Sequence, residues 1–446
     1  MRLQQIKPAA FCGIAEEVAI LKKINAKGGE VPAIMSEATA RQLLANRQLL
    51  KNIPEIKNIS DCPVLVKNAD GNLEAVTGYH AGSKVYAQGA PPVEMSHAEG
   101  VNLILGLLDD FKTSSEADKS RMLALMLSPA LIHGGILDAR VPLFIIEGDI
   151  PGCGKGTAAR LASAIYKADY ATITMRKGGV GSFDESLGAA YLSGKGFILI
   201  DNFRGALKSQ VFESAMTEPV TQVRQPYQGN VFLDVSRFIN VITSNGLEMT
   251  PDLARRTMAI RLKKQPDNFP FKHIDIVKHV EQNQPKYLGA VFSIIKYWYS
   301  CGADTSKISL PSYTEWARCL DCIIKNIMFM PPILEGNQGA IERMSNPALS
   351  WLREVALHIV RKKILGDLST TAIVKEIEGS VLIPGLQVDE QLNTDTMQKA
   401  NIATGVHIGK AFRDDDEVII DGLKIQRLKK WSSTRNELKT YKFSKG

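Results

Sequence analysis

The segment EGDIPGCGKGTAAR, residues 147–160, constrains the fold more than any other part of the sequence. It follows the apolar run VPLFII and leads into LASAIY, so we expect a glycine-rich turn between a buried strand and a helix. Backbone N–H groups can surround the oxygens of a triphosphate only where no Cβ is in the way, and Gly152, Gly154 and Gly156 provide that freedom. The segment therefore predicts a nucleotide site; a glycine-rich turn without a ligand is the alternative.

Lys155 supplies a positive charge for the β- and γ-phosphates, and a helix that begins near Gly156 adds the positive end of its dipole. The usual pattern for such loops is G-x-x-x-x-G-K-[ST]. Here Asp149 stands at the first glycine position and Gly156 directly follows the lysine, so Thr157 is the nearest hydroxyl for Mg²⁺. The residues expected to bind ATP are Pro151, Gly152, Cys153, Gly154, Lys155, Gly156 and Thr157.

Two further apolar runs end in polar residues, as buried strands do when they deliver side chains to the edge of a parallel sheet. GFILIDN places Asp201 after four apolar residues, and we expect its carboxylate to hold the water shell of Mg²⁺. FINVITSN ends with Asn245, which we expect to orient the attacking water or to contact the γ-phosphate. With Lys155, these residues predict a site for Mg²⁺ and ATP at one edge of a sheet.

An arginine pair follows in PDLARRTMAIRL, which the alternation of strands and helices assigns to a helix with Arg255 and Arg256 at one end. A guanidinium offered to a γ-phosphate accelerates hydrolysis by about three to five orders of magnitude where it operates. The alternative for such a pair is an ordinary surface ion pair.

The first two regions of the chain are predicted from the order of its apolar runs. Residues 1–90 are expected to form a small α+β region with a hairpin around Asp70-Gly71. Residues 91–265 open with a capping box at Ser96 and Glu99 and then alternate short apolar strands with helices, which predicts an α/β core with a parallel sheet.

The remaining two regions differ from this core. Residues 266–365 read as helices. Residues 366–446 contain the helices LSTTAIVKEIEG and TDTMQKANIATGVHIGKAF and then a basic hairpin turning at Asp421-Gly422, an order that suggests a winged helix.

Composition and cysteine content indicate the class of protein and its compartment. With 45% hydrophobic and 23% charged residues over 446 positions, the chain is an ordinary globular one, and no apolar run is long enough to span a membrane. Its six scattered cysteines favour a reducing cytoplasm. Cys319 and Cys322 form a CxxC that we assign to helix packing rather than to a metal, and no other catalytic motif competes.

Basic residues point to a polyanion as the partner. The last 25 residues carry eight Lys or Arg and one Glu, within a chain of net charge +7. TQVRQPYQGNVFLDV reads as a hairpin, and MRKGGVGSF as a glycine-rich loop; both could bind phosphates of single-stranded DNA without reading its sequence. The alternative for each stretch is an ordinary solvated surface. The residues expected to contact DNA are Arg176, Lys177, Arg224, Gln225, Tyr227, Gln228, Lys424, Arg427, Lys429, Lys430 and Arg435.

Taken in order, the glycine-rich loop, the Asp201 strand, the Asn245 strand and the arginine pair resemble the AAA+ ATPases, including the superfamily 3 helicases. Residues 95–265 look most like the helicase modules of phage and integrated-element replication proteins, on PLFIIEGDIPGCGKGT, FILIDN, AMTEPVTQVRQPYQGN, INVITSNG and DLARRTMAIRL. The resemblance implies a P-loop NTPase fold and a hexameric ring that moves along single-stranded DNA during replication, with duplex DNA possible at the C-terminal region. It also implies that Lys155 and Thr157 hold phosphate and Mg²⁺, and that Arg255 or Arg256 reaches the nucleotide of the next subunit.

Two departures from the family pattern keep alternatives open. Many AAA+ proteins have a second acid after the Walker B aspartate as general base, and here that position is Asn202. Either Asn202 positions water while another acid, such as Glu147, takes the proton, or turnover is slow, as in a non-motor AAA+ loader or switch. The Gly156-Thr157 order is also that of adenylate kinases, which leaves a nucleotide or polynucleotide kinase as a further alternative.

Overall fold

The computed structural model divides the chain into two compact units. The described residues are 6–148, 152–173, 182–225, 229–364, 366–378, 383–384, 393–412, 415–420, 422–431 and 437–445. The first unit comprises Met1–Arg204, Ser209–Asn245 and Arg256–Glu335, and the second comprises Gly205–Lys208, Gly246–Arg255 and Gly336–Gly446. Pro151, Arg176, Lys177, Tyr227, Gln228 and Arg435 lie outside the described residues, as do the side chains of Gln225 and Lys430.

The first unit begins with short elements. The hairpin predicted around Asp70-Gly71 is confirmed, because β4 and β5 are antiparallel partners and Gly71 between them has a φ of 82°. The elements are α1 (Pro8–Val18), β1 (Lys22–Ile24), β2 (Glu30–Pro32), α2 (Glu37–Leu44), α3 (Arg47–Asn52), β3 (Asn58–Ser60), β4 (Val64–Lys67), β5 (Leu73–Val76), β6 (Gly78–His80) and β7 (Val85–Ala87).

A mixed α/β core with a largely parallel sheet follows, as predicted. Its strand order is β10-β11-β14-β9-β15-β8; β9 is parallel to both β14 and β15, β10 is parallel to β11, and β8 is antiparallel to β15. The strands are β8 (Lys112–Thr113), β9 (Leu143–Gly148), β10 (Ala171–Ile173), β11 (Phe197–Ala206), β14 (Ile239–Glu248) and β15 (Thr257–Lys263).

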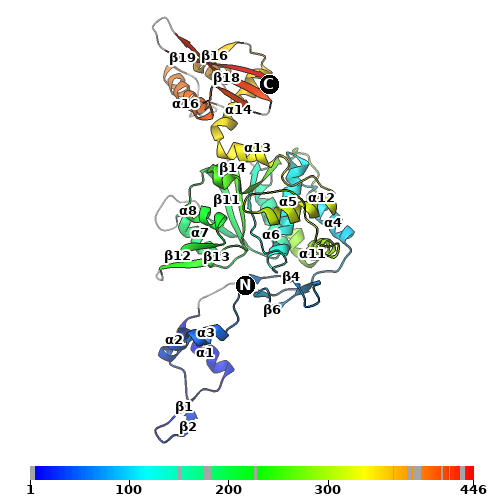
Figure 1. The fold of residues 1–446 in the computed structure, drawn as a ribbon, viewed down its shortest axis with the longest axis vertical. Coiled ribbons are helices and arrows are strands. Elements are labelled where there is room, and N and C mark those ends of the chain that lie inside the picture. The colour runs from blue at the N-terminus through cyan, green and yellow to red at the C-terminus, as the bar shows by residue number, and fades with distance from the viewer. Residues whose placement is uncertain are drawn as a thin grey trace. The chain divides into compact units, whose positions relative to one another are not determined.

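Helices cover both faces of this sheet, with α7 and α8 on one side of β11 and β14 and with α5, α6 and α12 on the other (Figure 1). Successive strand residues point to opposite faces, so Phe144 and Ile146 of β9 join the core that α5 and α6 complete. The helices are α4 (His97–Gly106), α5 (Glu116–Ile132), α6 (Lys155–Ile165), α7 (Phe183–Leu192), α8 (Gln210–Thr217), α10 (Ile276–Gln282), α11 (Gln284–Ser300) and α12 (Thr314–Asn326).

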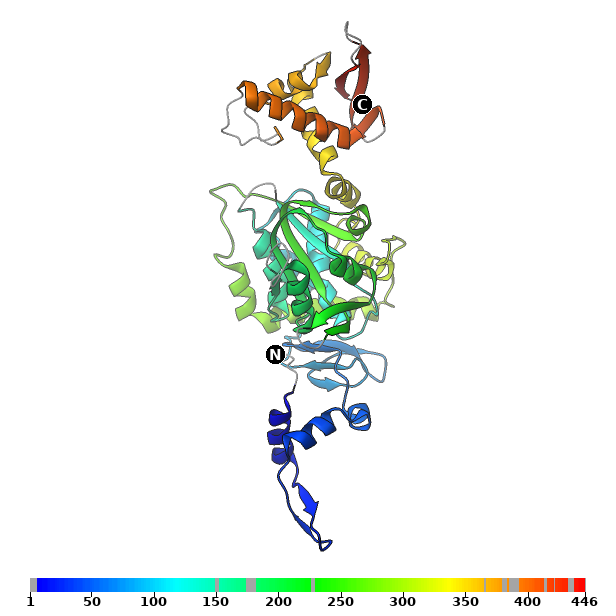
Figure 2. The same ribbon diagram turned by 90° about the vertical axis from the view of Figure 1, so that its left-hand side faces the viewer.

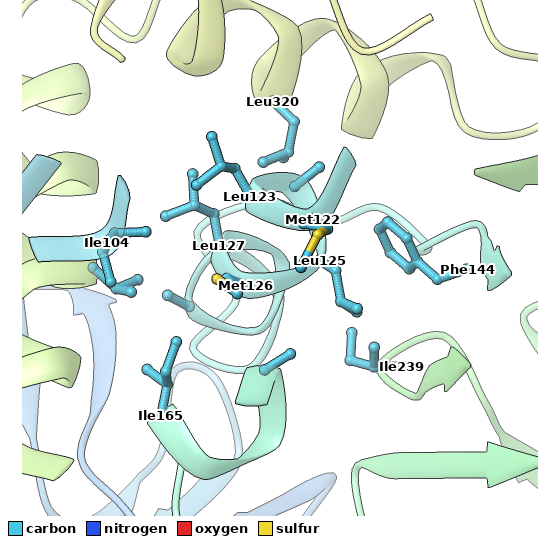
Figure 3. Packing of buried hydrophobic residues seen from close by; sticks show 14 of the residues in the cluster. Ile104, Met122, Leu123, Leu125, Met126, Leu127, Phe144, Ile165, Ile239 and Leu320 are labelled. Atoms are coloured by element: carbon cyan, nitrogen blue, oxygen red, sulfur yellow. The ribbon is translucent and has the colours of Figure 1, made fainter. Parts of the chain in front are cut away.

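Helix α5 lies at the centre of the core and is buried on almost every side. Figure 3 shows its methionines and leucines surrounded by Ile104 of α4, Phe144 of β9, Ile165 of α6 and Leu320 of α12. From Met122 to its end α5 is apolar apart from Ser128, which agrees with its place in the protein core.

The CxxC of α12 is part of this packing. Cys319 and Cys322 are 1% and 5% exposed, are not bonded to each other, and lie on one face of the helix. Burial raises the pKa of both thiols, so neither is a ready nucleophile. The prediction of core packing is confirmed. None of the helices in the described part of the chain has the length and apolar character needed to cross a bilayer.

The predicted capping box at the start of α4 is also confirmed. Ser96 Oγ accepts from the Glu99 N–H, and the Glu99 carboxylate accepts from the Ser96 N–H at 3.0 Å. Replacing Ser96 with alanine is expected to lower the free energy of unfolding by about 1 kcal/mol, measured by urea denaturation. Ser96→Thr keeps the hydroxyl that accepts from the Glu99 N–H and donates to the Glu99 carboxylate; it is the matched control and should stay close to wild type.

The sequence-based assignment of LARRTMAIRL to a helix is wrong. Only α9 (Pro251–Ala254) is helical, and Thr257–Lys263 forms β15, parallel to β9. The burial of Thr257, Met258, Ala259 and Ile260 explains the error, because a strand covered on both faces lacks an alternating pattern.

The second unit has its own core. Its antiparallel sheet has the order β16-β19-β18-β17, and the long helix α16, orange in Figure 2, lies beside it. The hairpin predicted next to Gly422 is confirmed by the pairing of Ile420 with Leu423. LSTTAIVKEIEG was predicted as a helix throughout, but Leu368 and Ser369 belong to β16 instead, because they pair with β19. The elements are α13 (Asn337–Ser345), α14 (Pro347–Arg361), β16 (Asp367–Ser369), α15 (Thr370–Glu376), α16 (Thr394–Phe412), β17 (Glu417–Ile420), β18 (Leu423–Trp431) and β19 (Glu437–Lys445).

Candidate functional site

The glycine-rich segment connects β9 to α6. Gly152 and Gly154 have φ values of 83° and 88°, a backbone conformation that residues with a Cβ rarely adopt. Gly154 is the N-cap of α6, so the helix begins at Lys155 and has Thr157 in its first turn. A Cβ on Gly148, at the end of β9, would lie only 2.1 Å from Cys153 Sγ, which shows that the segment folds back over the strand end.

Lys155 meets Asn245 at the end of β14. The Lys155 ammonium donates a hydrogen bond to Asn245 Oδ1 at 2.6 Å, across 90 positions of sequence. The sequence placed these two residues at one sheet edge, and the structure brings them into direct contact.

This contact lies where the chain reverses its direction across the sheet. From β9 the chain passes through α6 to β10, beyond β14 and β11, whereas from β14 it passes through α9 to β15, on the far side of β9. The connections that leave the adjacent carboxyl ends of β9 and β14 therefore diverge. In open α/β sheets, ligands bind in the crevice that such a divergence creates.

Asp201 of β11 is held at the same edge by Thr243 of β14. Thr243 Oγ1 donates to Asp201 Oδ1 at 2.6 Å and accepts from the Asn202 N–H at 2.7 Å. Asn202 has a φ of 52°, unusual for a residue other than glycine, so this hydrogen bond supports a strained backbone position within β11. Thr243 is 1% exposed, and its hydroxyl thus fixes both residues from inside the protein.

Sequence reasoning missed Thr243, although a signal was present. The apolar run INVIT contains one hydroxyl two positions before Asn245, and residues two apart on a strand share a face. A buried hydroxyl on the face that carries Asn245 was therefore predictable, but its partner on β11 was not.

The oxygen donors near Lys155 suit Mg²⁺. The Asp201 side chain is 38% exposed, and the Thr157 hydroxyl lies in the first turn of α6. Mg²⁺ is typically bound by one or two carboxylates together with waters and phosphate oxygens rather than by a cage of protein ligands. The described residues contain no cluster of three or more His, Cys, Asp or Glu side chains that could hold a metal.

The two residues of the arginine pair differ in how far they are buried. Arg256 is 8% exposed, and its Nη1 donates to Thr217 Oγ1 at 2.9 Å in the first unit. Arg255 belongs to the second unit; its side chain is 55% exposed and pairs with Asp252. Only Arg255 presents its guanidinium at the surface of the chain.

The predicted hairpin before β14 is confirmed as β12 (Val220–Gln225) and β13 (Gly229–Asp234). Arg224 is exposed on its outer face. Phe232, which sequence reasoning missed, is 73% exposed opposite Gln222 on the same face. An exposed aromatic beside an arginine is the combination that stacks on bases and binds phosphate.

Two basic residues of the C-terminal hairpin form ion pairs with acidic residues of the same unit. Lys424 contacts Glu417 at 2.9 Å and, with Gln426, holds the pKa of Glu417 below its ordinary value. Arg427 pairs with Asp416 at 3.0 Å and lies over the ring of Phe412. Lys429, by contrast, is exposed and lies directly opposite Lys439.

Comparison with known proteins leaves the family open. No family model and no curated protein matches the sequence. Among solved structures, the apo NrS-1 C-terminal region matches with a TM-score of 0.37 and 12% identity, over 99% of this chain and 100% of its own length. SCCmec type IV Cch, described as an active helicase, matches with 0.27 and 10%, over 91% of this chain and 80% of its own. JCV helicase with a bound acetamide compound matches with 0.27 and 12%, over 46% of this chain and 63% of its own. At these scores the matches carry no inference about function.

Proposed function

We propose that this chain is an ATP-dependent DNA helicase or translocase of a phage or mobile genetic element, acting in the cytoplasm as a hexameric ring on single-stranded DNA. The observation that carries the proposal is the contact between Lys155 and Asn245 at the switch point of the sheet, with Asp201 fixed on the neighbouring strand. A positive loop, a carboxylate and a polar residue on adjacent strand ends are what a phosphoryl-transfer site needs.

The chemistry would be divided among these residues. Lys155 and the N–H groups of the glycine-rich segment would bind the phosphates, and Asn245 would turn from Lys155 to the γ-phosphate or the attacking water. Thr157 and Asp201 would hold Mg²⁺, which when bound neutralises charge on the phosphate oxygens.

A base is also needed, and Asn202 cannot serve as one. Glu147 is the candidate, because it lies on β9 beside Ser244 of β14 and one residue before the strand ends. A non-motor switch with slow turnover is the second candidate function. The observation that favours it is Asn202, because an amide cannot take the proton from the attacking water.

DNA contacts would come from both units. The β12–β13 hairpin offers Arg224 and Phe232 to a single strand, and Arg176 and Lys177 stay expected contacts. We propose a winged-helix role in duplex binding for α14, α15, α16 and the β18–β19 hairpin, with Lys429 as its exposed cation.

The test is ATPase activity stimulated by single-stranded DNA, together with strand displacement on a forked duplex. Mass measurement with ATP and single-stranded DNA should show a hexamer. Phosphate transfer to a nucleotide or polynucleotide acceptor would instead support a kinase, and tight ATP binding without turnover would support the switch.

Thr243 provides a sharper test of the site. Thr243→Val keeps the side-chain volume but leaves Asp201 and the Asn202 N–H without their shared hydroxyl. We expect hydrolysis to fall about tenfold, the effect of one hydrogen bond to a charged group. Steady-state ATPase assays of Thr243→Val and Thr243→Ser check this, because serine restores the hydroxyl and should recover most of the activity. Wild-type activity in Thr243→Val, with a loss confined to Thr243→Ser, would assign Thr243 to packing alone.

A further inference from the structure

Arg160, one turn beyond the start of α6, extends toward Asp201. Its Nη2 lies 3.8 Å from Asp201 Oδ2, the carboxylate oxygen that Thr243 does not bind. Its Nη1 lies 3.4 Å from the point where a Cβ on Gly156 would stand. The guanidinium therefore reaches from the first turn of α6 to the carboxylate on β11.

This position matters because Asp201 and Thr157 are the two residues expected to hold Mg²⁺. Arg160 pairs with Asp201 and lies on α6, the helix that carries Thr157. A guanidinium keeps its proton under all ordinary conditions, so its charge cannot be lost when a metal ion approaches. Two cations that share one carboxylate repel each other, so each weakens the binding of the other.

A similar arrangement holds at Lys155. The Lys155 ammonium is bound by Asn245, and the Asp201 carboxylate is paired with Arg160. Each charge that a nucleotide–metal complex would use thus has a partner on the protein. The Arg160 side chain is 56% exposed, which leaves it free to swing into solvent when Asp201 is needed.

We propose that Arg160 competes with Mg²⁺ for Asp201, because its guanidinium pairs with the carboxylate that is expected to hold the metal. The inference rests on the proposed nucleotide site, and it gives Arg160 a positioning role that the sequence motifs do not indicate. Its consequence is that Arg160 raises the Mg²⁺ concentration at which nucleotide binds.

Binding of a fluorescent, non-hydrolysable ATP analogue, titrated with Mg²⁺ and followed by anisotropy, tests the competition. Arg160→Ala is expected to lower the half-saturating Mg²⁺ concentration about two- to fivefold, the range that an exposed ion pair supports. Arg160→Lys keeps the charge and should shift it less. Lys167→Ala removes an exposed cation just beyond the other end of α6 and should leave the half-saturating concentration unchanged.

A double-mutant cycle with Asp201→Asn locates the effect. Without the carboxylate, Arg160→Ala should no longer shift the Mg²⁺ requirement. An unchanged or increased requirement in the single Arg160→Ala variant would overturn the inference, as would an equal shift in the Asp201→Asn background. Analogue binding by the wild type with no Mg²⁺ effect in any Arg160 variant would leave the proposed function standing. No analogue binding by the wild type at any Mg²⁺ concentration would overturn the proposed function and this inference together.

Discussion

Lys155→Ala is expected to lower ATP hydrolysis by roughly a hundred- to a thousandfold, the range measured when a single preorganised donor to a developing charge is removed. Lys155 is the first residue of α6, and its ammonium already points to the strand edge where Asn245 ends β14. The Lys155 ammonium would therefore need little rearrangement to bind a phosphate in the crevice. Single-turnover ATPase assays measure the loss.

The structure also supplies the controls. Lys155 is only partly buried, so the circular dichroism spectrum and thermal stability of the variant should match the wild type. Asn245→Ala removes the partner of Lys155 but keeps the charge, and we expect it to reduce hydrolysis while retaining ATP binding. Unchanged turnover in Lys155→Ala would move the nucleotide site away from the glycine-rich segment.

The sheet core was predictable because its strands carry strong local signals. PLFIIEG and FINVITSN are apolar runs that end in polar or glycine residues, and such runs fit buried parallel strands better than surface helices. That Lys155 and Asn245 share one sheet edge followed from this assignment, because carboxyl ends of parallel strands lie at the same edge; their direct hydrogen bond did not follow from it.

The missed features depend on partners that lie far away in the sequence. TMAIRLK became β15 because β9 was available to pair with it, and a local pattern does not show that neighbour. Thr243 binds Asp201 across two strands, and Arg160 reaches the same carboxylate from a helix. Side-chain direction in three dimensions decides the contacts of Thr243 and Arg160, and spacing along the chain does not show that direction.

The arginine pair shows the same limit. In the sequence, Arg255 and Arg256 are equivalent candidates for a finger, and adjacent residues cannot be distinguished by pattern. The structure buries Arg256 against Thr217 and exposes Arg255. Burial in its own subunit makes Arg256 unsuited to reach a neighbouring one, so we assign the proposed finger to Arg255.

Arg255→Ala is accordingly expected to lower hydrolysis by about three to five orders of magnitude while ATP still binds. Arg256→Ala should instead lower the free energy of unfolding by about 1–3 kcal/mol, because it removes a buried side chain together with its partly buried hydrogen bond to Thr217. ATPase assays, nucleotide-binding titrations and urea denaturation of both variants separate the two roles. Asp252→Asn removes the charge that pairs with Arg255 at the surface. This variant should retain activity, since exposed ion pairs contribute little free energy.

Mixing two inactive variants tests whether Arg255 acts on the neighbouring subunit. Lys155→Ala subunits lack a working pocket but keep Arg255, and Arg255→Ala subunits have the opposite defect. In a ring, a subunit of the first kind can offer its arginine to the intact pocket of the second, so mixed assemblies should regain part of the wild-type ATPase activity. If Arg255 acted on its own pocket, every subunit in the mixture would stay defective and no activity would return. Recovery in the mixture would therefore support both the finger assignment and the proposed ring, and its absence after subunit exchange would contradict them.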